Sequence, residues 1–177
     1  ENRLKLLWVC PYLPREGSHG GGGRMFALIR ELATRHEVWV ISFATAEEET
    51  AAAPLREICH HVDVVPRTYP WRYDPLSHWP WGVQEFYHPA MAALIRRRLL
   101  EEAFDVAQFE YLQMAQYAPS EYVGARLLTE HQVLGFARWR DLKSPIFPWS
   151  QKLHVVASAL KGLAYELSVC SRFDGVI

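Results

Sequence analysis

The chain has 177 residues, of which 50% are hydrophobic and 22% charged, and its formal net charge is −1. This length suits one domain with a real core, and the near-neutral charge gives no reason to expect affinity for nucleic acid. The three cysteines lie far apart, which disfavours a disulfide framework or a zinc site and fits a reducing compartment. No apolar run approaches the roughly 18 residues that a membrane span needs.

The beginning of the chain predicts a strand, a glycine-rich loop and a helix. Residues 6–10 form an unbroken apolar run, typical of a strand covered on both faces. Four glycines, Gly20 to Gly23, leave the backbone open to a ligand and allow positive φ. Apolar residues then recur at helical spacing from Arg24, so we expect the helix to begin directly after the glycines. Its free N–H groups would favour a phosphate.

Two known phosphate-binding motifs do not fit this loop. A Walker loop ends in Gly-Lys-Ser/Thr, whereas this one continues Gly-Arg-Met. The dinucleotide fingerprint places its glycines directly after the strand, and here about ten residues intervene. We therefore predict a long, glycine-rich loop at the mouth of an α/β sheet. The resemblance described below implies that Gly21, Gly22, Gly23 and Arg24 are its ligand contacts. The alternative is a surface turn without a ligand.

The rest of the chain alternates strands with helices. Apolar and β-branched runs predict strands at 37–43, 62–65, 105–109, 125–129 and 174–177. Helical spacing predicts helices at 51–60, 89–103, 112–118, 132–141 and 151–172, the last carrying Leu153, Val156, Leu160, Leu163 and Leu167. This order predicts a Rossmann-like, three-layer α/β/α domain with a mostly parallel sheet.

Residues 68–88 are irregular, broken by prolines and unusually aromatic. So long a segment in a compact domain usually has a function. Its rings, Trp79 and Trp81 among them, could stack on a sugar or lipid acceptor. Equally, they could pack back onto the sheet as a small core of their own.

Polar residues follow two of the predicted strands. Glu110 and Tyr111 follow one strand, Glu130 and His131 follow the next, and Arg138 lies just beyond. Ligands of open parallel sheets bind at the carboxyl ends of the strands, so we expect these residues to share an edge with the glycines. A histidine beside a carboxylate can act as a base, hold a hydroxyl or orient a phosphate partner. The alternative is a structural role for His131.

The chain resembles the N-terminal half of GT-B glycosyltransferases, specifically glycosyltransferase family 4. The resemblance is carried by the segments LLWVCPYLP…GGGGRMFALIRELATRHEVWVISF, FDVAQFEY, LLTEHQVLGFARWR and YELSVCSRFDGVI. It implies that residues 1–177 form an acceptor-side domain. A C-terminal donor-binding domain, absent from this chain, would face it across a cleft, and the piece alone would be inactive.

The resemblance also implies roles for individual residues. The glycines and Arg24 would lie at the diphosphate of a nucleotide-sugar donor, and His131, the catalytic-site residue, would position the transferred sugar. The acceptor side would include Glu110, Tyr111, Arg138, Trp79 and Trp81. Transfer would be retaining and would need no metal or cofactor, with the leaving phosphate taking the acceptor's proton.

Two other functions fit the sequence less closely. One is a non-catalytic module that binds a glycan or a protein partner through the aromatic segment, and the other is half of a nucleotide-sugar epimerase. For the transferase, we expect synthesis of a cell-surface or extracellular polysaccharide in the cytoplasm. Lipid-linked acceptors would place the protein at the inner face of the membrane, although no strong basic amphipathic helix is apparent.

Overall fold

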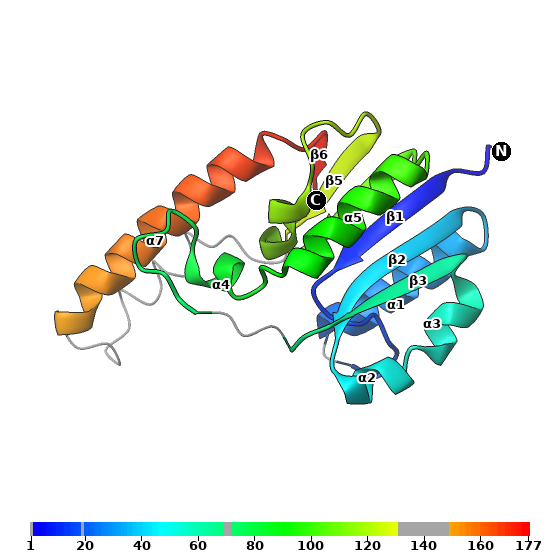
Figure 1. The fold of residues 1–177 in the computed structure, drawn as a ribbon, viewed down its shortest axis with the longest axis horizontal. Helices are drawn as coiled ribbons and strands as arrows, with labels where there is room; N and C mark the ends of the chain where they lie inside the picture. The colour runs from blue at the N-terminus through cyan, green and yellow to red at the C-terminus, as the bar shows by residue number, and fades with distance from the viewer. Residues whose placement is uncertain (1, 19, 69–71, 131–148) are drawn as a thin grey trace.

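The computed structural model describes residues 2–18, 20–68, 72–130 and 149–177. Six strands form one sheet in the order β3-β2-β1-β4-β5-β6, and every neighbouring pair is parallel (Figure 1). The strands are β1 (Lys5–Cys10), β2 (Glu37–Ala44), β3 (His61–Pro66), β4 (Val106–Glu110), β5 (Ala125–Thr129) and β6 (Gly175–Val176). This order is that of the Rossmann fold, so the predicted fold class is confirmed.

Helices cover both faces of the sheet because successive strand residues point to opposite sides. Trp8 and Cys10 pack with α1 (Gly20–Ala33) and α3 (Ala53–Ile58) on one face. Leu7 and Val9 belong to the core of the other face. That second face carries α5 (Pro89–Glu101), the 3-10 helix η1 (Leu112–Tyr117) and α7 (Trp149–Cys170). The remaining described helices are the short α2 (Ala46–Thr50) and α4 (Trp81–Gln84).

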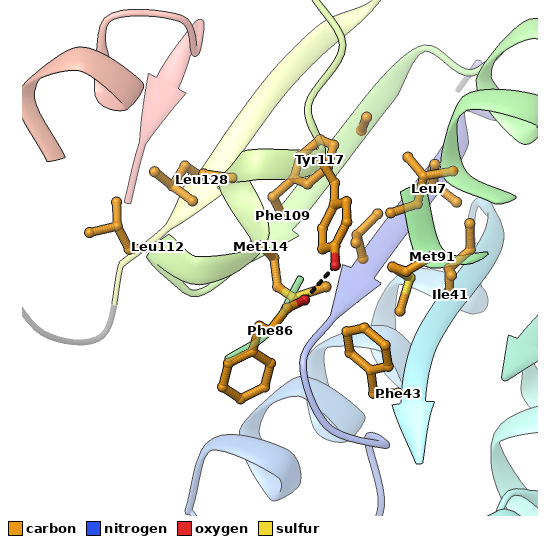
Figure 2. Close-up of a cluster of buried hydrophobic side chains, with 14 of the residues drawn as sticks. Leu7, Ile41, Phe43, Phe86, Met91, Phe109, Leu112, Met114, Tyr117 and Leu128 are labelled. Atoms are coloured by element: carbon orange, nitrogen blue, oxygen red, sulfur yellow. Dashed lines mark hydrogen bonds between the residues drawn. The ribbon is translucent and has the colours of Figure 1, made fainter. Parts of the chain in front are cut away.

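The second core reaches into the aromatic segment. Figure 2 shows Phe43, Phe86, Met91 and Phe109 among its buried side chains. The hydroxyl of Tyr117 donates a short hydrogen bond to the backbone carbonyl of Phe86, which ties η1 to the end of the segment (Figure 2). Residues 72–88 are therefore anchored on the sheet at their C-terminal end.

The glycine run is helical, which corrects the prediction of a glycine loop. Helix α1 begins at Gly20, and the described glycine with positive φ is Gly17, outside the run. Glycine disfavours a helix by about 1 kcal/mol relative to alanine, which is why the sequence pattern predicted a loop. Burial of Met25, Phe26 and Ile29 against the sheet stabilises the helix sufficiently to include the glycines as its first turn.

Residues 46–58 also differ from the prediction, since two helices replace the single one expected at 51–60. Helix α2 begins with a capping box, in which Thr45 and Glu48 each bond the other's backbone N–H. Pro54 lies in the first turn of α3, where its missing N–H costs nothing.

Helix α7 packs against η1 and, through Tyr165 and Val169, against the second core, and it leaves an aliphatic face exposed. Its buried residues include Val155, Tyr165 and Val169. Four residues at helical spacing are exposed instead: Val156, Leu160, Leu163 and Leu167. Among the described helices, α7 included, none is long and apolar enough to cross a membrane.

Candidate functional site

The strand order places a crevice at the carboxyl ends of β1 and β4. After β1 the chain continues to β2 on one side of this pair, and after β4 it continues to β5 on the other side. Ligands of open α/β sheets bind at such a reversal. Here β1 ends at Cys10, β4 ends at Glu110, and α1 starts at Gly20.

The first turn of α1 supplies backbone donors to this edge. The first four N–H groups of a helix have no intrahelical partner, and the helix dipole favours an anion beside them. A Cβ on the buried Gly22 would lie 2.1 Å from Ser18 Oγ, so packing against the preceding loop explains that glycine. A Cβ on Gly20 or Gly23 would meet no atom within 4 Å. Neither packing nor positive φ accounts for these two glycines, and the open space above them can admit a ligand.

Arg24 lies beside Glu110, although 86 residues separate them. Arg24 Nη1 donates to Glu110 Oε2 at 3.3 Å. The Glu110 side chain is fully buried, whereas that of Arg24 is 40% exposed. On its other oxygen, Glu110 accepts hydrogen bonds from Gln108 Nε2 at 3.4 Å and from Thr129 Oγ1 at 3.3 Å. The buried carboxylate therefore orients a guanidinium that stays open to solvent at the sheet edge.

Tyr111 has a strained backbone at the same edge. Its φ of 69° and ψ of 145° lie in a region that L-residues rarely adopt. Two hydrogen bonds stabilise this backbone conformation. The N–H of Tyr111 donates to Thr129 O at 2.8 Å, and its carbonyl accepts from Met114 N at 2.9 Å. Such outliers cluster at functional sites, so this one supports the choice of edge.

An aromatic wall that the sequence analysis missed stands next to Tyr111. The Tyr12 ring makes edge contacts with Tyr111 at 5.9 Å and with Phe86 at 5.6 Å between centroids. The Arg67 guanidinium lies 4.4 Å from the Phe86 ring centroid. Burial raises the pKa of the Tyr12 and Tyr111 hydroxyls, so both stay protonated at neutral pH and can donate a hydrogen bond. Tyr12 follows β1 closely, and that position was the signal that could have found it.

Two carboxyl groups, those of Glu130 and Glu166, interact electrostatically beyond β5. Burial, and then the nearby charge of Glu166 on α7, raise the pKa of Glu130 to about 7. One Glu130 oxygen, Oε1, is buried without a hydrogen-bond partner among the described residues. Glu130 was predicted to share this edge, whereas Glu166 was not expected from the helical pattern. In the described part of the chain, no three His, Cys, Asp or Glu side chains gather as a metal site would require.

The remaining predicted residues fall in two groups. Trp79 is half-buried against the core, and Trp81 on α4 is 48% exposed. His131 and Arg138 lie outside the described residues, so their proximity to the glycines stays a prediction.

No protein-family model matches the chain, and no curated protein matches it. A solved structure does match. It is the crystal structure of Arabidopsis thaliana UGT89C1 complexed with UDP, at a TM-score of 0.50 and 10% sequence identity. The match covers 99% of this chain and 45% of UGT89C1, so the chain spans less than half the length of that neighbour. At this identity the likeness shows a shared fold.

Proposed function

We propose that the chain is the acceptor-side half of a nucleotide-sugar-dependent glycosyltransferase. The observation that carries this proposal is the match of nearly the whole chain to part of UGT89C1, a GT-B glycosyltransferase solved with UDP. The unexplained open space at Gly20 and Gly23, on the edge where Rossmann folds bind ligands, supports it. The family-4 assignment rests on the sequence resemblance.

In this proposal, the first turn of α1 and Arg24 bind the donor diphosphate. Backbone N–H groups of Gly21, Gly22 and Gly23 point along the helix axis toward a negative charge, and the guanidinium adds a charge-assisted hydrogen bond. Glu110 is a positioning residue, because its carboxylate is buried and pairs with the partly exposed Arg24 guanidinium. Tyr111 and Trp81 would contact the acceptor, together with His131 and Arg138.

The proposed chemistry is retaining transfer without a metal. The bond between the sugar's anomeric carbon and the leaving phosphate oxygen breaks, and the acceptor oxygen bonds to that carbon on the same face. The acceptor's proton passes to the leaving phosphate. Chain residues then bind, orient and exclude water, with His131 holding the sugar.

The protein's wider role is also a proposal. A donor-binding domain would complete the site, since the chain corresponds to 45% of UGT89C1. We propose polysaccharide synthesis in the cytoplasm. A lipid-linked acceptor would bring the protein to the inner face of a membrane.

Titration of UDP and pyrophosphate into the ¹⁵N-labelled chain tests the diphosphate site. We expect shifts in the amide signals of Gly20–Gly23 and about tenfold weaker binding in Arg24→Gln, because a hydrogen bond to a charged group contributes about 1.5–3 kcal/mol. Arg35→Gln, two residues beyond the other end of α1, is the matched control. Gly23→Leu should keep the fold and abolish binding, since its side chain enters open space. Unchanged glycine signals at millimolar UDP would refute the site.

A glycan-binding module remains the second candidate, because three aromatic side chains of the 72–88 segment are exposed. They are Tyr73 at 37%, Trp81 at 48% and Tyr87 at 42%. Exposed rings of this kind can stack on sugars. Glycan binding that is independent of UDP and is lost in Trp81→Ala would favour the module over the transferase.

A further inference from the structure

A cavity of about 330 Å³ lies between the aromatic segment, η1 and α7. Its lining residues are His78, Trp79, Gln116, Ala164, Tyr165, Ser168, Val169 and Arg172. Ligand pockets usually span about 300–1,000 Å³, so this volume suits a small ligand rather than a nucleotide sugar. The cavity shares no lining residue with the Arg24–Glu110 pair, and the diphosphate site does not account for it.

Hydrogen bonds from Gln84 and Lys161 fix the outer wall of the cavity. The buried Gln84 amide accepts from Asp74 N at 2.9 Å and donates to Trp79 O at 2.8 Å. Lys161 of α7 donates through Nζ to the carbonyls of Pro75 and Ser77 at 2.6 and 2.8 Å. These bonds hold the segment before Trp79 against α4 and α7. The cavity is therefore formed before any ligand binds, which lowers the entropic cost of binding.

The inner wall includes an acceptor that lacks a donor. Gln116 Nε2 donates to Val83 O at 2.9 Å and to Gln113 O at 2.7 Å, and these two carbonyls fix the orientation of the amide. Its Oε1 is buried and accepts no hydrogen bond from the residues that the structure describes. An unsatisfied buried acceptor is unfavourable, so a hydroxyl group inserted beside it, with a small shift of the side chain, would be stabilised.

The mouth of the cavity carries a cation without an acidic partner. Arg172 follows α7 and is exposed, and no described residue forms an ion pair or hydrogen bond with its guanidinium. His78 adds a second donor at the mouth, 5.8 Å from the Trp79 ring between centroids. Guanidinium groups bind carboxylates and phosphates in a bidentate manner.

We propose that this cavity binds one acidic sugar unit, a monosaccharide that carries a carboxylate or a phosphate. The half-buried Trp79 ring offers an apolar surface for the sugar's C–H groups, Gln116 accepts from a hydroxyl, and Arg172 binds the acid. The inference rests on the proposed function only in that such a unit would belong to the acceptor. The binding site itself does not require transferase activity.

Titration of four probes into the labelled chain tests the cavity: D-glucuronate, D-glucose 6-phosphate, D-glucose and inorganic phosphate. We expect one or both acidic sugars to shift the Trp79 indole N–H signal, and to bind at least tenfold more tightly than glucose or phosphate. The stronger of the two identifies the acid as carboxylate or phosphate. These signals are distinct from the glycine amides of α1, so failure here and failure of the diphosphate site are separate results.

Variants then test the assigned contacts. Arg172→Gln should weaken binding of the acidic sugar about tenfold and Arg172→Lys by less, whereas Arg97→Gln on the exposed surface of α5 should leave it unchanged. Trp79→Phe should weaken binding of every sugar but keep the preference for the acid. Binding of phosphate alone as tight as that of the acidic sugar, equal binding of glucose, or an Arg172→Gln protein that binds normally would each overturn the proposal.

Discussion

Alanine substitutions at Gly22 and Gly23, in the first turn of α1, distinguish a glycine required for packing from a glycine that borders open space. At Gly23 a new Cβ meets nothing within 4 Å, so alanine should stabilise the protein by about 0.5 kcal/mol through helix propensity. At Gly22 a Cβ would lie 2.1 Å from Ser18 Oγ and 3.2 Å from Ser18 Cβ. A new Ser18 rotamer moves Oγ away but leaves the second contact, and the loop itself must then shift.

The loss of stability in Gly22→Ala can be estimated from the interactions that Ser18 would lose. Its hydroxyl donates to Arg15 O at 3.0 Å, and losing that bond costs about 0.5–1.5 kcal/mol. Overpacking adds about 1–3 kcal/mol, against the same helix gain of about 0.5 kcal/mol. Gly22→Ala should therefore be destabilised by about 1–4 kcal/mol. The two alanine variants should therefore differ in stability by about 1.5–4.5 kcal/mol, which for a domain of this size is a difference in Tm of about 3–18 °C.

Thermal unfolding followed by circular dichroism, together with urea titration, measures this difference. The double variant Ser18→Gly/Gly22→Ala removes the contacting side chain and should recover most of the lost stability. Equal stability of Gly22→Ala and Gly23→Ala would refute the packing explanation. So would a Ser18→Gly change that fails to rescue Gly22→Ala.

Three further predictions test the sheet edge. Tyr111→Gly should be about 1–2 kcal/mol more stable in urea than Tyr111→Ala, because both lack the ring but only glycine adopts φ 69° without strain; equal stability would argue against stored strain. Arg24→Gln should cost about 1–2 kcal/mol more alone than in a Glu110→Gln background, since the single change removes a cation beside a buried carboxylate, and a strictly additive double-mutant cycle would exclude that coupling. An unfolded glutamate loses its proton near pH 4.5 but folded Glu130 holds it to about pH 7, so stability falls as pH rises through this window. Glu130→Gln should become more stable than wild type across this window, by about 1–2 kcal/mol at pH 8 after allowance for partial exposure; parallel stability–pH profiles of Glu130→Gln and wild type would contradict the raised pKa.

Most of the fold could be predicted because its signals are local. The apolar run at residues 6–10, the β-branched run at 37–43 and the alternation with helical periods were sufficient for a parallel sheet with two covered faces. Helix α5 begins at Pro89, as predicted from proline's fit to a first turn. The predictions that failed depended on weighing propensity against burial. At Gly20–Gly23, tertiary packing of α1 outweighs the poor propensity of glycine.

The candidate site was only partly accessible from the sequence. The glycines, Arg24, Glu110 and Tyr111 were identified as members of one edge, because parallel strands place their carboxyl ends together. Two features of the site could not be predicted. Glu110 is buried and pairs with Arg24. The rings of Tyr12 and Phe86 lie beside Tyr111. These contacts join residues far apart in the chain, and a single sequence carries no record of such distances.

The sequence by itself determined most of the order of elements, the parallel sheet and the sheet edge that we propose as the ligand site. Those properties follow from apolar periodicity and chain direction, which are set by neighbouring residues. Only the tertiary structure decided that α1 starts at Gly20, that Leu160, Leu163 and Leu167 remain exposed, and that Trp79, Gln116 and Arg172 surround one cavity. Each of these depends on which surfaces meet after folding, and many alternative packings are compatible with the same local pattern.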